Sequence, residues 1–162
     1  KESFFDHVLL LQGDEPQINP IDMQKLKHAF KDFHADVINL IFPISGNDIS
    51  DPNVVKAIVS ESNKIKFFTR AHAPYQSQKG IRQLGMIGFT SEALKTYMNL
   101  EMTDLEILES IDMMRFLEND INIQGVYSSS PILGVDIPSD IKKVEHLMSD
   151  DSFLNQYQSK YL

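Results

Sequence analysis

The sequence predicts an α/β fold in a single domain spanning residues 1–162. Short apolar runs bounded by glycine, proline or polar turns alternate along the chain with amphipathic segments of helical period, a pattern typical of strands and helices packed in layers. With 162 residues, of which 42% are hydrophobic, the chain is long enough for one domain with its own core.

The chain opens with a predicted strand followed by a helix. Residues 7–12 (HVLLLQ) form a short apolar run that ends at a glycine, which favours a buried strand in the middle of a parallel sheet. Asn19 followed by Pro20 predicts a helix start, and the apolar positions that follow keep a helical spacing to about His34.

The next segments predict strands and a long loop. A strand is expected over residues 36–44, and VVKAIVS (54–60) and IKFFTR (65–70) are expected to pair as a hairpin. Residues 71–83 have no periodicity and contain proline, glycine and polar residues, which predicts a long surface loop.

The second half alternates between strand and helix. The capping box Thr103-x-x-Glu106 predicts one long helix to about residue 119, and Pro138 predicts the start of the last helix. The other expected elements are a strand over 84–90, a helix capped by Ser91, a strand over 121–128 and a weakly helical tail over 150–162.

Composition narrows the classes of function. The chain has no cysteine, which excludes disulfides and thiolate metal sites and leaves oxygen and imidazole ligands, as for a hard cation such as Mg²⁺. The net charge of −8, with basic residues scattered singly, argues against nucleic-acid binding. No apolar run approaches the roughly 20 residues of a membrane span, so a cytoplasmic protein without membrane contact is expected.

Two aspartates are candidates for a metal site. Asp14 follows the first strand in QGDEP, and Asp136 precedes the last helix in GVDIPSD, both in places where α/β sheets bind ligands. Carboxylates there suit a Mg²⁺ that also holds phosphates. Residue types alone leave the alternatives open that QGDEP is a solvated turn and that Asp136 only favours the positive end of the helix.

The segments QGDEP, DPNVVKAIV, FFTRAHAPY, LGMIGF, LEILESIDMMRFLEN and LGVDIPSDI follow one another along the chain. In this order they resemble the C-terminal portion of the CMP-Kdo synthetase (3-deoxy-manno-octulosonate cytidylyltransferase) family. The resemblance extends from about Val8 to about Leu147. It implies a three-layer α/β/α mixed sheet of the nucleotide-diphospho-sugar transferase type, which is Rossmann-like and glycosyltransferase-A-like.

The resemblance implies nucleotidyl transfer. The anomeric hydroxyl of an ulosonic acid would attack the α-phosphate of CTP, giving a CMP-sugar and pyrophosphate for surface polysaccharide or lipopolysaccharide. Family roles carry over to Asp14 and Asp136 as catalytic magnesium ligands, to Gln12 in the substrate cleft and to Arg70 facing the acidic sugar. A homodimer is also implied.

Four positions depart from the family pattern. Gln83, Ile87, Asp112 and Met113 stand where the family has histidine, tyrosine, glutamate and glutamine facing the sugar. Polar groups in such a pocket are placed to meet particular hydroxyls, so these changes predict a pocket shaped for a different ulosonic acid. Arg115 matches the family but is expected to lie on a solvated helix face, too far from Glu109 to pair with it.

One family motif is absent. The glycine- and lysine-rich loop that holds CTP in the family has no counterpart in this sequence, so the N-terminal nucleotide-binding half is expected to be missing and the chain to be inactive alone. The alternative is a non-catalytic relative that dimerises or binds a ligand.

Overall fold

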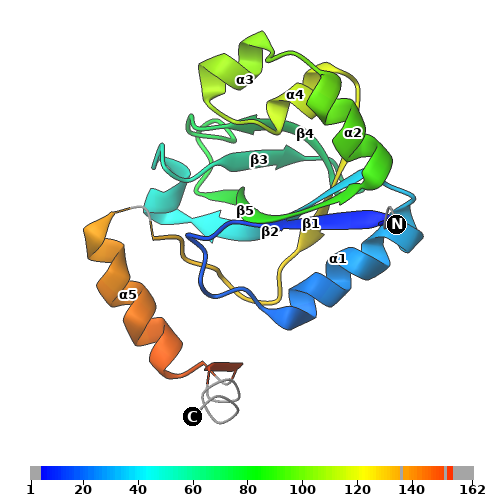
Figure 1. Ribbon diagram of the computed structural model, residues 1–162. Coiled ribbons are helices and arrows are strands. Elements are labelled where there is room, and N and C mark those ends of the chain that lie inside the picture. Colours follow the sequence, from blue (N-terminus) through cyan, green and yellow to red (C-terminus); the bar gives the residue numbers. More distant parts are fainter. Residues whose placement is uncertain (1–4, 136, 152, 155–162) are drawn as a thin grey trace.

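The structure, a computed structural model, describes residues 5–135, 137–151 and 153–154. A curled mixed sheet lies between α1 on one face and α2, α3 and α4 on the other (Figure 1). The six strands are β1 (His7–Leu11), β2 (Val37–Ser45), β3 (Lys56–Val59), β4 (Lys64–Thr69), β5 (Lys79–Thr90) and β6 (Ile123–Tyr127). The helices are α1 (Pro20–Phe33), α2 (Ser91–Asn99), α3 (Asp104–Glu109), α4 (Met114–Glu118) and α5 (Pro138–Ser149), with a 3-10 turn η1 (Gly46–Ile49). None of these helices has the length and apolar character that a membrane crossing requires.

The strand order is β1-β5-β2-β6-β4-β3, and among the pairs of neighbouring strands in the described residues only β2 and β6 are parallel. A further pairing of Lys56 with Arg82 joins β3 to β5, so the sheet curls towards the first half of β5. Alternate residues of the strands enter two cores. One core packs Leu26 and Phe30 of α1 against the sheet, and the other packs Phe116 of α4 on the opposite face. Two apolar layers on one sheet confirm the three-layer α/β/α fold.

Local sequence signals account for several elements. The side chain of Asn19 accepts a hydrogen bond from the backbone N–H of Ile21, and Pro20 occupies the first turn of α1, as predicted. The predicted hairpin is confirmed, because β3 and β4 pair antiparallel from Lys56 opposite Thr69 to Val59 opposite Ile65.

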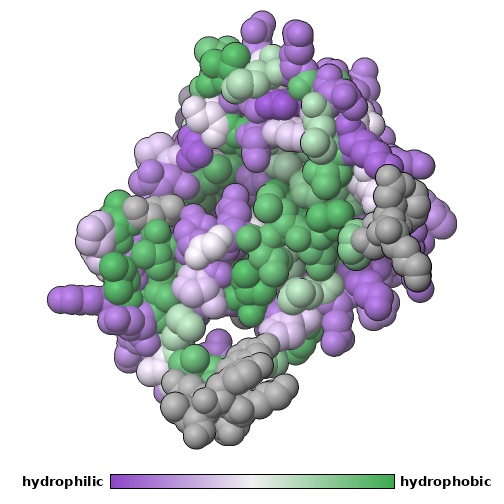
Figure 2. All heavy atoms as spheres, viewed as in Figure 1, coloured by the Kyte–Doolittle hydropathy of each residue, from purple (hydrophilic) through white to green (hydrophobic). Residues whose placement is uncertain are grey.

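The prediction that residues 7–12 form a parallel strand is wrong for the neighbour that the structure describes. In the part of the chain that the structure describes, β1 pairs antiparallel with β5 and lies at the edge of the sheet. Leu10 and Leu11 are 42% and 37% exposed, and apolar surface gathers over β1 in Figure 2. An apolar run shows that a strand is favourable but not how many neighbours it has.

Two further predictions need correction. The loop expected over 71–83 is shorter, because residues from Lys79 onward join β5 and pair with β2. The single helix expected from Thr103 is broken after Glu109, since Ser110 adopts a left-handed conformation (φ 54°) and ends α3. The chain folds back there before α4 begins at Met114. Most of the tail expected to be helical lies outside the described residues.

A bulge in β5 shapes the sheet beside β1. Asn39 pairs with Ile87, but two residues later Ile41 pairs with Gln83, so Leu40 alone faces three residues of β5. Gly85 lies at the centre of this bulge. Bulges redirect the backbone and are frequent next to binding sites.

Candidate functional site

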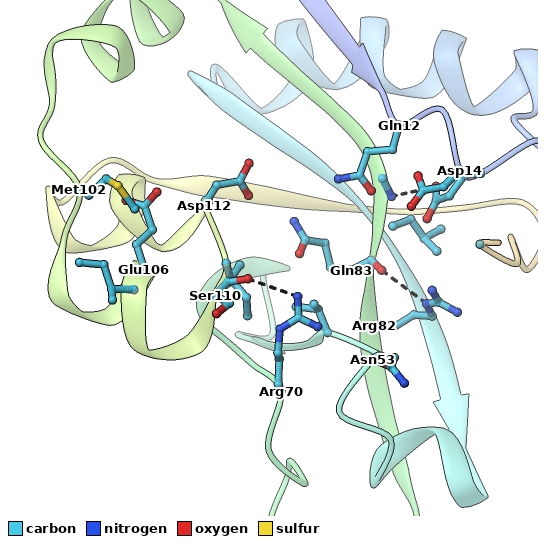
Figure 3. Close-up of a pocket in the computed structure, with 17 residues that line it drawn as sticks. Gln12, Asp14, Asn53, Arg70, Arg82, Gln83, Met102, Glu106, Ser110 and Asp112 are labelled. Atoms are coloured by element: carbon cyan, nitrogen blue, oxygen red, sulfur yellow. Dashed lines mark hydrogen bonds between the residues drawn. The ribbon is translucent and has the colours of Figure 1, made fainter. Parts of the chain in front are cut away.

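A pocket of about 770 Å³ lies where the end of β1 and the middle of β5 meet the turn between α3 and α4 (Figure 3). Gln12, Asp14 and Gln83 come from the sheet side, and Asp112 lies across from them. The other lining residues are Glu15, Asn53, Val55, Arg70, Arg82, Leu84, Gly85, Met102, Glu106, Ile107, Ser110, Ile111 and Gly134. The lining is mainly polar, as expected for a hydrophilic ligand.

The end of β1 is held on the bulge by Gly85. The backbone N–H of Gln12 donates to the Gly85 carbonyl (3.0 Å), and the Gly85 N–H donates to the Glu15 carboxylate (2.9 Å). Glu15 is only 6% exposed, so this acid of the QGDEP motif is buried, and the alternative that the whole motif is a solvated turn is wrong for Glu15. With Glu15 bonded to Gly85, the neighbouring side chains of Gln12 and Asp14 are exposed and line the pocket.

Gly85 is needed because Gln12 lies over it. A Cβ at this position would be 2.4 Å from Oε1 and 2.8 Å from Cβ of Gln12. We expect Gly85→Ala to displace Gln12 and to lower the free energy of unfolding by about 1–3 kcal/mol, as overpacking does. Urea denaturation would measure this. Gly13→Ala is the matched control, since its Cβ would meet no atom within 4 Å. Equal stability of the two variants would contradict the expectation.

Asp14 presents an exposed carboxylate next to the segment before α5. Its side chain forms no hydrogen bond or ion pair with the described residues, while its backbone carbonyl accepts from the N–H of Val135 (2.8 Å). The second predicted metal ligand, Asp136, lies outside the described residues. Within residues 5–135, 137–151 and 153–154, no group of three or more His, Asp or Glu side chains is arranged to hold a metal ion. An exposed carboxylate of this kind fits Mg²⁺ that completes its shell with substrate phosphates.

Arg70 is fixed by the backbone. Its side chain donates to the carbonyls of Glu109 (3.1 Å), Pro52 (3.0 Å) and Ser110 (3.2 Å), and its own N–H donates to the Glu109 carboxylate (3.0 Å). The guanidinium has no ion-pair partner among the described side chains. A positive charge held in this way at a polar pocket is suited to a carboxylate ligand.

Lys56 holds the backbone of Arg70 by a hydrogen bond. Its side chain is fully buried, and Nζ donates to the carbonyls of Asp51 (2.7 Å) and Arg70 (2.8 Å). Burial lowers the pKa of Lys56 from its usual 10.5, against the opposite effect of Asp51. Lys56 thus joins the segment before β3 to the end of β4. His72, in the loop after β4, is exposed, and its ring bonds the Ser50 hydroxyl and the Ser77 carbonyl outside the pocket.

The prediction that Arg115 lies on a solvated helix face is wrong. Its guanidinium donates two bonds of 2.6 Å to Glu106, which is 5% exposed, and lies 4.3 Å from the centre of the Tyr97 ring. A continuous helix would hold residues nine apart at different levels. The break at Ser110 brings them together.

The ion pair between Glu106 and Arg115 is expected to contribute to the free energy of unfolding in a pH-dependent way. The bonds from Arg115 lower the pKa of Glu106 below its usual 4.5, and the N–H of Thr103 acts in the same direction, while burial opposes them. A carboxyl whose pKa is lowered in the folded state stabilises above pH 4.5, and this stabilisation is lost as pH falls through the folded-state pKa. At pH 7, the free energy of unfolding of Glu106→Gln should therefore be about 2 kcal/mol lower than that of the wild type.

Urea denaturation at pH 7 and pH 3 would measure the effect, with the exposed Glu101→Gln as control. We expect the difference between Glu106→Gln and wild type to shrink at pH 3. A difference that stays constant with pH would contradict the assignment.

The four positions that depart from the family pattern separate into two groups. Gln83 and Asp112 line the pocket. Ile87 and Met113 are 1% and 2% exposed and pack in the core under α4, so the expectation that they contact a substrate is corrected. The case for a different sugar therefore depends on two side chains.

Comparisons with known proteins agree with this geometry. The 3-deoxy-manno-octulosonate cytidylyltransferase of Myxococcus xanthus (strain DK1622) is 32% identical over 143 residues, which cover 85% of this chain and 58% of the relative. The enzyme of the same name from Chlorobium limicola (strain DSM 245 / NBRC 103803 / 6330) is 32% identical over 152 residues, covering 88% and 62%. No family model matches the chain.

A solved structure has the same fold. It is CMP:2-keto-3-deoxy-manno-octonic acid synthetase complexed with CTP, with a TM-score of 0.81 and 29% identity over 89% of this chain and 62% of that one. The chain spans about three-fifths of the length of the curated relatives it matches. Over 85–89% of its own length, the chain is therefore similar, in sequence and in fold, to about three-fifths of a 3-deoxy-manno-octulosonate cytidylyltransferase.

Proposed function

We propose that this chain forms the sugar-acid side of a magnesium-dependent cytidylyltransferase, which converts CTP and a 3-deoxy ulosonic acid into a CMP-sugar and pyrophosphate. The observation that carries the proposal is the guanidinium of Arg70, held by three backbone carbonyls at a polar pocket without an ion-pair partner in the described part of the chain. It supplies the positive charge that the carboxylate of a sugar acid requires.

The lining residues suit the remaining groups of such a substrate. Gln12 and Gln83 offer amides to sugar hydroxyls from the sheet side, and Asp112 offers an acceptor from the α3–α4 turn. Holding the sugar between fixed groups orients its anomeric hydroxyl, and such positioning supplies much of the catalysis in phosphoryl-type transfer.

Asp14 is proposed to hold Mg²⁺ at the mouth of the pocket, together with Asp136. Bound there, the ion would neutralise charge on the phosphates of CTP. Support comes from the exposed carboxylate of Asp14 and from the bond of its backbone to Val135, which brings the two motifs together in the chain.

We also propose action as a homodimer in the cytoplasm, in the synthesis of surface polysaccharide or lipopolysaccharide. Exposed apolar side chains on α2 and α3, such as Met98 (77%) and Leu108 (78%), offer a surface for a second copy. Sedimentation of a monomer at all concentrations would contradict the dimer.

Calorimetric titration of the chain with 3-deoxy-manno-octulosonate and related ulosonic acids tests the pocket. We expect Arg70→Met to weaken binding about 10- to 100-fold, because a charge-assisted pair is lost. The control is Lys66→Met, which removes an exposed cation on β4. Pyrophosphate release with CTP and Mg²⁺ would then test the reaction. Release would contradict the expectation that the chain is inactive alone, binding without release would agree with it, and no binding of any ulosonic acid would contradict the proposal.

A further inference from the structure

A buried asparagine lies beneath the pocket. Asn39 is fully buried on β2, between Val37 and Ile41, which enter the core on the same face of the sheet. An amide in an apolar row is unfavourable unless its hydrogen bonds are made. The partners of Asn39 therefore decide what it does there.

Two backbone carbonyls set the orientation of this amide. Nδ2 of Asn39 donates to the carbonyl oxygens of Leu84 (2.9 Å) and Leu40 (3.0 Å), beside the bulge in β5. Carbonyl oxygens can only accept, so Nδ2 must face them and Oδ1 must face the other way. The nitrogen and oxygen of an amide side chain have nearly the same shape, so their assignment comes from hydrogen-bond partners. Here the two carbonyl acceptors identify the nitrogen of Asn39.

The orientation of Asn39 is passed to Gln83. Oδ1 of Asn39 accepts a hydrogen bond from Nε2 of Gln83 (2.7 Å), so the nitrogen end of the Gln83 amide is held against the strand. Gln83 lines the pocket, and its Oε1 bonds no described residue. Among the described residues, the only buried side-chain nitrogen or oxygen without a hydrogen-bond partner is Oγ1 of Thr103. Oε1 of Gln83 is therefore not buried and unpaired.

We propose that Asn39 is a positioning residue for ligand selection: it fixes Gln83 so that the pocket presents a hydrogen-bond acceptor, which selects a ligand carrying a hydroxyl at that point. The inference rests on the proposed function, because it concerns how the same pocket chooses among sugar acids. A pocket group placed to bond a hydroxyl rejects a ligand that lacks it.

The same reasoning covers the histidine that the family pattern has at position 83. A neutral imidazole donates through one ring nitrogen and accepts through the other. With Asn39 accepting from the first, the second would face the pocket as an acceptor. Gln83→His should therefore keep the preference for the hydroxyl, whereas Gln83→Leu should lose it.

The first test needs no ligand. Hydrogen exchange of side-chain amides, followed by nuclear magnetic resonance on the whole chain, compares Gln83 with the exposed Gln24 of α1. We expect the Gln83 hydrogen that Asn39 accepts to exchange at least about tenfold more slowly, and this protection to be lost in Asn39→Leu. Equal exchange at Gln83 and Gln24 in the wild type would overturn the positioning role.

The second test measures selection. Dissociation constants are determined for 3-deoxy-manno-octulosonate and for analogues that each lack one hydroxyl. In the wild type, one analogue should bind about 3- to 10-fold more weakly than the parent, the effect of one hydrogen bond. This ratio should fall to about one in Gln83→Leu and also in Asn39→Leu.

The double variant separates positioning from a general effect. If Asn39 acts through Gln83, adding Asn39→Leu to Gln83→Leu should not change the ratio further. A loss in Asn39→Leu that is equal for the parent and for every analogue would overturn the inference. If no sugar acid binds the wild type, the proposed function fails and ligand selection fails with it, while the exchange experiment still decides whether Asn39 holds Gln83.

Discussion

In the complete cytidylyltransferase of which this chain is proposed to form a part, replacing Asp14 by asparagine is expected to lower the rate of CMP-sugar formation by about 100- to 1,000-fold. The range is that for removing one group which stabilises charge in a transition state. Asparagine keeps the size of the side chain but removes its charge, and a neutral amide is a poor ligand for a cation that prefers carboxylates. The backbone bond between Val135 and Asp14 does not involve the side chain, so the local fold should remain.

The decisive measurement separates metal dependence from sugar binding. Pyrophosphate release is followed as Mg²⁺ is varied, and the affinity for the ulosonic acid is measured independently by calorimetry. Asp14→Asn should lose the response to Mg²⁺ and keep the sugar affinity within about twofold, because Arg70 and not Asp14 is proposed to bind the carboxylate.

Asp36→Asn is the matched control for Asp14. Asp36 is an exposed acid that precedes β2, and its backbone bonds Thr90 at the other end of the sheet from the pocket. It should retain the wild-type rate. A rate for Asp14→Asn within tenfold of the wild type would contradict the role of Asp14 as a metal ligand.

Much of the fold follows from local patterns in the sequence. The apolar run of β2, the Asn19–Pro20 start of α1 and the hairpin of β3 and β4 depend on residues close together in the chain, and all three are confirmed. By contrast, the break at Ser110 could not be predicted, because serine is uncommon in the left-handed conformation and the apolar spacing continues across it.

The site was predicted in part. Gln12, Asp14, Arg70, Gln83 and Asp112 are brought to one pocket, and these are the positions where a motif predicted a role. Ile87 and Met113 were grouped with them by motif alone, but both side chains pack inward under the helices.

Buried charges and amides were missed for a common reason. Glu15, Lys56 and Asn39 each bond a group contributed by a distant part of the chain, as when Glu15 accepts from Gly85, 70 residues away. A single sequence gives no signal for such pairs. Where it contains an acid in a turn or a lysine in an apolar strand, the usual interpretation is solvent exposure.

Asp22 is another such residue, and its replacement is expected to have the largest effect on stability. It is fully buried in the first turn of α1 and accepts hydrogen bonds from Ser128 Oγ (2.6 Å), Ser129 N (2.9 Å) and Ser129 Oγ (2.9 Å). Lys25 Nζ lies 3.3 Å away. These contacts join the start of α1 to the end of β6, where the chain turns towards Val135.

Asp22→Asn should lower the free energy of unfolding by about 2–3 kcal/mol, the range for hydrogen bonds to a charged group. The amide has the same size, but its NH₂ would face donors in place of one carboxylate oxygen and leave a buried N–H unpaired. The midpoint of thermal unfolding should fall by roughly 5–10 °C for a domain of this size. Asp32→Asn, an exposed change on the same helix, should stay within about 0.5 kcal/mol of the wild type. An Asp22→Asn protein as stable as Asp32→Asn would show that the turn formed by Ser128 and Ser129 is held by other contacts.

The turn formed by Ser128 and Ser129 leads to the segment that bonds the Asp14 backbone. Asp22→Asn should therefore also weaken the response of the reaction rate to Mg²⁺.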